Sequence, residues 1–150
     1  MTAARRRKRT PVVPQESSAE VSRRLLLDTH AWLWWQADDP RLGVATRRML
    51  QHASEVRFSA ASAWEIGIKL TLGKLSLPRD ADISAALADS GFLPLAVDIA
   101  HAQGVQRLPP LHRDPFDRML VAQARIEGLT LVTADRQLGA YGIPVMDATL

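Results

Sequence analysis

Short runs of apolar residues alternate along the chain with longer stretches in which apolar residues recur every three or four positions. The short runs are typical of buried parallel strands and lie at 25–27, 56–59, 92–97, 129–133 and 143–146. The longer stretches predict helices over 29–37, 44–53, 61–72, 81–90, 99–108 and 115–127. Strands that alternate with helices indicate the α/β class, here a three-layer α/β/α sandwich with a central parallel sheet of about five strands.

Turn residues mark several of these boundaries. Pro115 stands where a first helical turn accepts proline, because that position donates no helical hydrogen bond. Gly73, Gly91 and Gly128 follow three of the predicted helices, where a left-handed residue commonly ends a helix. These residues support the helix assignments independently of the apolar pattern.

Composition narrows the class of protein. A chain of 150 residues, 47% hydrophobic and 23% charged, is long enough for one globular domain with a substantial core. The sequence has no Cys, which excludes disulfides, Cys-ligated zinc and thiol catalysis and suits a reducing cytoplasm. No stretch approaches 18 consecutive apolar residues, so we expect a cytoplasmic protein without a membrane span.

The positive charge is unevenly distributed. The formal net charge is +3, but residues 1–24 carry +5 and residues 25–150 carry −2. The first segment has only scattered apolar residues, which predicts a disordered basic extension over 1–24 and a folded domain over 25–150. No apolar stretch follows its arginine run, so it is not a secretory signal. The extension is either a phosphate-binding arm or the product of an upstream start codon.

Acidic residues gather at the predicted carboxyl edge of the sheet, where open α/β sheets bind their ligands. They follow strands or open helices at five positions: Asp28, Glu65, Asp114, Asp117 and Asp135. Each has an ordinary structural explanation when taken singly. The aspartates could cap or complement helix N-termini, and Glu65 with Lys69 could be a surface ion pair.

Together these acids would repel one another unless a cation neutralised them. Carboxylate ligands, without Cys and without a paired-His motif, favour Mg²⁺ or Mn²⁺ over zinc. The four His residues are scattered, and only His112 lies near the acidic loop, where we expect a structural or substrate-side role. Such a site suits attack of water on a phosphodiester.

Four sequence blocks resemble the PIN-domain family, and most closely the VapC-type toxins of bacterial toxin–antitoxin pairs. In chain order they are LLLDTHAWLWW (25–35), FSAASAWEIGIKLTLGKL (58–75), LPPLHRDPFDRMLVAQA (108–124) and LTLVTADRQL (129–138). The third is similar to the block of the HRDPFDR subgroup. The resemblance covers residues 25–148 and leaves out the basic extension.

The resemblance implies that Asp28, Glu65, Asp117 and Asp135 are the catalytic acids, which hold one or two metal ions. It implies a Mg²⁺-dependent endoribonuclease, the toxin of a type II toxin–antitoxin pair, with Mn²⁺ as a possible substitute. The expected partners are a cognate antitoxin, an RNA substrate and a second copy of the chain in a homodimer.

Further residues receive supporting roles. Asp114 accompanies the metal-site acids as a supporting or loop-capping residue. Thr29 and Thr133 could orient carboxylates or a bound water through their hydroxyl groups. Arg118 and Arg136 could each hold an RNA phosphate or pair with a neighbouring carboxylate.

Four tryptophans admit two interpretations: Trp32, Trp34, Trp35 and Trp64. Aromatic rings could stack on RNA bases. Trp32 and Trp35 share a helical face, however, which favours packing in the core or against a partner. The resemblance implies that the first and third helices help to form the antitoxin groove.

Two other functional classes compete with a nuclease. A non-catalytic nucleic-acid-binding module would use the basic extension for affinity. A receiver or haloacid-dehalogenase-type phosphatase would also have an acidic pocket. Both of these folds fit poorly, because Asp28-Thr29-His30 lacks a second Asp and Arg136 stands where a receiver needs Lys.

Overall fold

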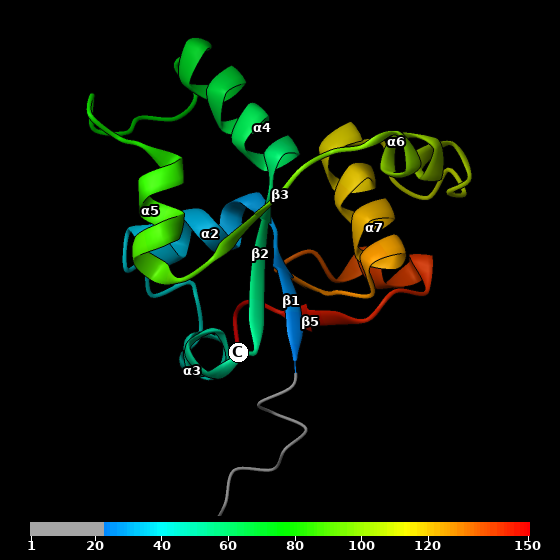
Figure 1. Ribbon diagram of the computed structural model, residues 1–150, viewed down its shortest axis with the longest axis horizontal. Helices are drawn as coiled ribbons and strands as arrows, with labels where there is room; N and C mark the ends of the chain where they lie inside the picture. The colour runs from blue at the N-terminus through cyan, green and yellow to red at the C-terminus, as the bar shows by residue number, and fades with distance from the viewer. Residues whose placement is uncertain (1–22) are drawn as a thin grey trace, which may run out of the picture.

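The computed structural model describes residues 23–150 and contains one five-stranded parallel sheet (Figure 1). The strands are β1 (Arg24–Leu27), β2 (Glu55–Ser59), β3 (Leu93–Leu95), β4 (Thr130–Thr133) and β5 (Val145–Asp147), and their order across the sheet is β3-β2-β1-β4-β5. The strand order changes direction at β1, so the carboxyl ends of β1 and β4 border the crevice where such sheets bind ligands. The predicted parallel α/β fold is confirmed.

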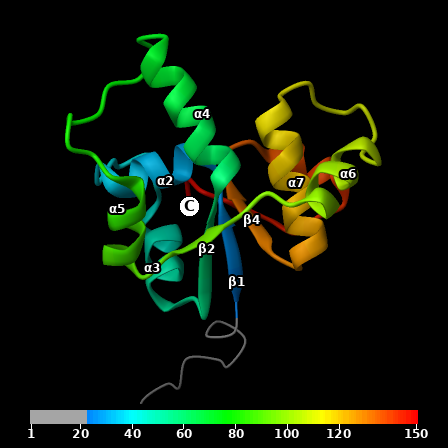
Figure 2. The same ribbon diagram turned by 45° about the horizontal axis from the view of Figure 1, so that its top comes forward.

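The helices are α2 (Thr29–Gln36), α3 (Val44–His52), α4 (Ala60–Thr71), α5 (Ile83–Ser90), α6 (Ile99–Gln106) and α7 (Pro115–Glu127), followed by the 3-10 helix η1 (Arg136–Tyr141). Helices α2, α3 and α5 cover one face of the sheet, and α6 and α7 cover the other (Figures 1 and 2). All six predicted α-helices are present. The 3-10 helix was not predicted from the sequence. Among residues 23–150, no helix has the length and apolar character needed to cross a membrane.

Both faces of the central strands are buried, which explains their continuous apolar runs. Leu25 and Leu27 point into the core beneath α2 and α3, whereas Leu26 points into the core beneath α6 and α7. A strand with one solvent-facing side would alternate apolar and polar residues instead. The three leucines are fully buried.

Several predicted boundaries shift for identifiable reasons. Strand β1 begins at Arg24, whose guanidinium pairs with Glu55 of β2 at 2.7 Å. Residues 23 and 24 therefore belong to the folded part, and the rest of the predicted extension lies outside the described residues. Strand β3 covers only Leu93–Leu95 of the predicted 92–97, because it is an edge strand and its Pro94 has no N–H for the ladder.

Several helices end or begin at the kinds of residue that commonly cap helices. Gly91 and Gly128 end α5 and α7 in the left-handed conformation, with φ of 71° and 66°. Helix α5 begins at Ile83, two residues after the predicted start, because the Asp82 carboxylate caps it. These local signals position the elements, and the sheet then sets where their ends meet.

Candidate metal centre

The predicted acids line one pocket of about 470 Å³ at the carboxyl edge of the sheet. They come from the end of β1, helix α4, the start of α7 and the segment after β4. The lining consists of Asp28, Thr29, His30, Trp34, Glu65, Lys69, Asp114, Asp117, Ala134 and Asp135. Residues up to 107 positions apart in the sequence thus form a single acidic site.

Asp28 is both a helix cap and a pocket residue. Its Oδ1 accepts a hydrogen bond from the Ala31 N–H at 2.7 Å at the start of α2, and the residue is only 7% exposed. Burial raises the pKa of the Asp28 carboxyl, because the charged form loses hydration. Hydrogen bonds from the Thr133 hydroxyl and the Ala31 N–H oppose this rise.

Asp117 lies in the first turn of α7, three residues after Asp114, the capping residue of that helix. Asp114 accepts hydrogen bonds from the Phe116 N–H at 2.8 Å and the Asp117 N–H at 3.3 Å. Burial, followed by the negative charge of Asp114, raises the pKa of Asp117 to about 7. The charges of Asp28 and Glu65 add to this rise. Without a cation, the site therefore retains a proton on Asp117 near neutral pH.

Glu65 and Lys69 form an ion pair that belongs to the pocket rather than to the open surface. Glu65 is 7% exposed, and its Oε2 lies 3.2 Å from the Lys69 Nζ one helical turn away. Both side chains line the acidic pocket. The i,i+4 pair recognised in the sequence exists, but it places a cation at the site.

Asp135 uses its two carboxylate oxygens differently. Oδ1 accepts a hydrogen bond from the Gln137 N–H at 3.0 Å and caps η1. Oδ2 lies 3.1 Å from His112 Nε2, which is also 3.6 Å from Asp117 Oδ2. The Thr133 hydroxyl accepts the Asp135 N–H at 3.0 Å, so Thr133 contacts two of the four acids.

The two arginines proposed as phosphate ligands do not line this pocket. The Arg118 guanidinium donates to the carbonyl oxygens of Pro109 and Val105 and to the Tyr141 hydroxyl, at 2.9, 3.2 and 3.2 Å. Arg136 pairs with a carboxylate, that of Asp147, at 2.7 Å. Arg118 therefore stabilises the segment between α6 and α7 through hydrogen bonds to its carbonyl groups. This role differs from both predicted roles, phosphate binding and pairing with a carboxylate.

The tryptophans divide between core and surface. Trp32 is buried in the core, and Trp35 is packed against it. Trp34 lines the acidic pocket. Trp64 is 67% exposed, and its ring forms a T-shaped contact with Phe116, with centroids 5.4 Å apart. Core packing thus involves three of the four, because Trp34 also packs against this core, and it includes Trp32 and Trp35 as their helical spacing indicated.

The donor set fits a divalent cation with hard ligands. Four carboxylates and a threonine hydroxyl supply oxygen atoms, the ligands that Mg²⁺ and Mn²⁺ prefer. The Thr29 Oγ1 atom is buried and has no hydrogen-bond partner among residues 23–150. This hydroxyl, at the wall of the pocket, is therefore free to contact a bound ion or its water.

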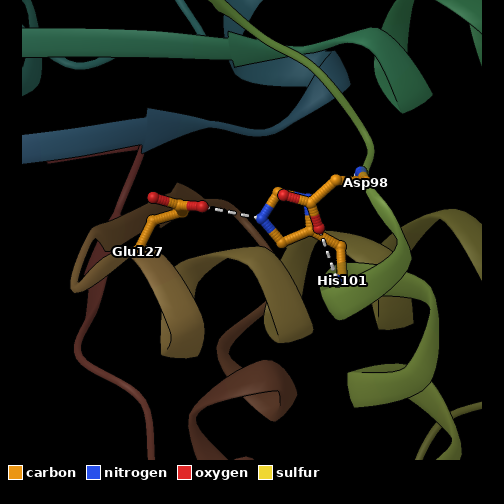
Figure 3. A group of neighbouring side chains, drawn as sticks. All are labelled: Asp98, His101 and Glu127. Atoms are coloured by element: carbon orange, nitrogen blue, oxygen red, sulfur yellow. Dashed lines mark hydrogen bonds and ion pairs between the residues drawn. The ribbon is translucent and has the colours of Figure 1, made fainter.

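Figure 3 shows a second group of ligand-type residues, none of which lines this pocket. Asp98, His101 and Glu127 each place one ligand atom within 4.8 Å of the others, so they could hold a metal ion. In this structure, these residues are hydrogen-bonded to one another. The Asp98 N–H donates to His101 Nδ1 at 3.1 Å, and His101 Nε2 lies 2.8 Å from Glu127. The buried His101 thus joins α6 to α7, and the sequence analysis had assigned none of the three to a site.

Comparison with known proteins defines the class. The PIN-domain family matches residues 25–143, and the chain belongs to this family. It is 31% identical over 128 residues to "Ribonuclease VapC22" of Mycobacterium tuberculosis, a match that covers 80% of this chain and 93% of that protein. The resemblance inferred from the four sequence blocks is confirmed for the family, and the subgroup stays a prediction.

Solved structures share the fold at low sequence identity. VapBC2 from Rickettsia felis bound to a promoter DNA fragment has a TM-score of 0.63 and 14% identity, covering 82% of this chain and 97% of that chain. DNA-bound VapBC from Salmonella typhimurium has a TM-score of 0.63 and 19% identity, covering 83% and 98%. These likenesses establish the PIN-like sandwich.

Proposed function

We propose that the protein is a Mg²⁺-dependent endoribonuclease, the toxin component of a type II toxin–antitoxin pair. The observation that carries this proposal is the convergence of Asp28, Glu65, Asp117 and Asp135 on one pocket. Membership of the PIN family and the similarity to a protein named a ribonuclease support it.

In the proposed reaction, the four acids hold the cation and the chain prepares the site for a phosphodiester. A divalent cation bound there lowers the pKa of a water molecule and offsets charge on the phosphate. Asp117, which retains a proton in the metal-free site, must lose it before its carboxylate binds the ion. Lys69 supplies a positive charge at the pocket wall, and Thr29 supplies a hydroxyl that can orient water.

Substitution of single acids by Asn tests the proposal. Asn caps a helix about as well as Asp, so Asp28→Asn retains the N-cap of α2 while removing the charge. We expect Asp28→Asn and Asp117→Asn to abolish Mg²⁺-dependent RNA cleavage, as EDTA does with the wild type. Asp89→Asn, on the exposed side of α5, is the matched control and should cleave normally. Undiminished cleavage by either pocket variant would refute the mechanism.

We also propose that a cognate antitoxin binds this chain and that the chain forms a homodimer, in the cytoplasm. The solved structures of the same fold include a toxin–antitoxin complex from Klebsiella pneumoniae, VapBC2 bound to a promoter DNA fragment and a DNA-bound VapBC. Co-expression with the product of a neighbouring short reading frame should yield a complex that no longer cleaves RNA. Small-angle scattering of the purified chain measures its oligomeric state.

A non-catalytic nucleic-acid-binding module remains the alternative, and it depends on the basic segment. Deletion of residues 1–22, which leaves β1 intact, tests it directly. Loss of salt-dependent RNA binding together with an absence of Mg²⁺-dependent cleavage would support the alternative. Retention of cleavage by the shortened chain would exclude it.

A further inference from the structure

The hydrogen bonds of His112 at the acidic pocket define the tautomer of its neutral ring. The ring Nδ1 accepts a hydrogen bond from the backbone N–H of Asp114 at 3.2 Å. A nitrogen that accepts this bond carries no proton, so the neutral ring carries its proton on Nε2. That nitrogen faces two of the proposed metal ligands, 3.1 Å from Asp135 Oδ2 and 3.6 Å from Asp117 Oδ2.

This arrangement makes His112 a hydrogen-bond donor to a ligand rather than a ligand itself. Nε2 could coordinate an ion only through a lone pair, which the protonated nitrogen lacks. His101 makes the same two kinds of hydrogen bond. Its Nδ1 accepts a bond from the Asp98 N–H, and its Nε2 forms one with the Glu127 carboxylate. At His101 the bond joins two helices in the interior, whereas at His112 it ends at the pocket.

Asp135 is the acid that most needs such support. Its side chain is 38% exposed, against 26% for Asp117, and it follows β4 at the entrance to a 3-10 helix. Oδ1 accepts the capping hydrogen bond from Gln137 and Oδ2 the one from His112, which leaves each oxygen a further lone pair for an ion. A donor at Oδ2 fixes the rotation of the carboxylate, and its partial positive charge lies close to both carboxyl groups.

We propose that His112 is a positioning residue. It holds the Asp135 carboxylate next to that of Asp117, in the orientation in which the two together bind the divalent cation. This inference rests on the proposed metal-dependent function. Hydrogen-bond partners of metal ligands typically contribute about 10- to 100-fold to metal affinity. The expected effect of losing His112 is therefore on the dissociation constant of the ion.

Three substitutions separate the two hydrogen bonds of the ring. His112→Ala removes both. His112→Gln can place an amide N–H near the position of Nε2 and keeps the bond to Asp135. His112→Asn can place its oxygen near Nδ1, which keeps the bond from Asp114 but loses the one to the pocket. His52→Ala, at the exposed end of α3, is the matched control.

Calorimetric titration of the full chain with Mn²⁺ and with Mg²⁺ gives the dissociation constants, and thermal melts verify folding. We expect about 10-fold or weaker binding of both ions by the Ala and Asn variants, recovery to within a few-fold by the Gln variant, and no change in His52→Ala. RNA cleavage at increasing Mg²⁺ should recover in the Ala and Asn variants at saturation.

Unchanged affinity in His112→Ala would overturn the inference. So would wild-type affinity in His112→Asn, which would assign the effect to the loop. A loss confined to Mn²⁺ that Gln does not restore would instead identify His112 as a direct ligand. A wild-type chain that binds the ions but cleaves no RNA would refute the proposed function while leaving the positioning role testable. A chain that binds neither ion would overturn both.

Discussion

Asp117→Asn should stabilise the metal-free protein while destroying its capacity to bind metal. Asp117 is largely buried beside Asp114, and these surroundings raise its pKa from 3.8 to about 7. Between about pH 4 and pH 7 the folded chain retains a proton there that the unfolded chain has released. The folded state binds more protons in this window, so its stability falls as the pH rises. A neutral Asn side chain removes that loss.

The size of the effect follows from the change in pKa. A rise from 3.8 to about 7, at about 1.36 kcal/mol per pKa unit, gives an upper limit of roughly 4 kcal/mol above pH 7. About a quarter of the Asp117 side chain is exposed, so water and salt screen part of this interaction. We therefore expect a gain of about 1–2 kcal/mol at pH 8, or about 2–8 °C in melting temperature. The gain should shrink to a few tenths of a kcal/mol near pH 4.

Thermal and urea melts in EDTA at pH 4, 6 and 8 test this expectation. Asp89→Asn is the control for removing an exposed negative charge from the domain. Excess Mg²⁺ should stabilise the wild type and leave Asp117→Asn unchanged, because the variant lacks one of the proposed ligands. A variant that is no more stable than the wild type at pH 8, or whose advantage is the same at all three pH values, would refute the reasoning.

Three further predictions concern the site and the surrounding fold. Apparent Mn²⁺ affinity should rise about tenfold per pH unit below pH 7 and level off above it, because Asp117 gives up one proton on binding; calorimetry at several pH values measures the slope. Arg118→Met should cost about 1–3 kcal/mol in urea unfolding, because it removes the guanidinium that holds carbonyl groups before α7. Gly43→Ala should destabilise by about 1–3 kcal/mol, since its Cβ would lie 1.9 Å from the Leu150 carbonyl oxygen. The control Gly67→Ala, with open space around its Cβ on α4, should stabilise by up to about 1 kcal/mol. A Gly43→Ala variant as stable as the control would contradict the docking of the C-terminal segment.

Helix capping and the proposed metal binding involve the same side chains. Asp28, Asp114 and Asp135 each accept a backbone hydrogen bond at the start of a helix, and each also lines the acidic pocket. In a parallel α/β fold, strands end where helices begin, so capping carboxylates gather at one edge of the sheet. The simple structural explanation of each acid is therefore correct, and it does not compete with the functional one. For this reason Asn, which retains the cap, is a cleaner probe than Ala.

Local patterns in the sequence were sufficient to predict the five strands, the six α-helices and the parallel sheet, and to place the acids at one edge of that sheet. Apolar periodicity reports which side of an element is buried, and Pro115, Gly91 and Gly128 mark helix ends by their backbone preferences. The position of Asp28 and Asp135 after strands placed them at one edge, because all strands run in the same direction. Each of these inferences depends either on residues that are close together in the sequence, within about one helical turn, or on a general rule of sheet topology.

Tertiary structure alone decided which partner each polar side chain meets. Arg118 adjoins Asp117 in the sequence, yet it binds backbone carbonyl groups and Tyr141. His112 reaches Asp135 across 23 residues, and no local pattern encodes that contact. A hydrogen bond forms with whichever group the packing of α7 and η1 brings within about 3 Å, and that choice depends on the whole fold. The sequence by itself determined where the negative charge collects, whereas the three-dimensional packing decided how that charge is held.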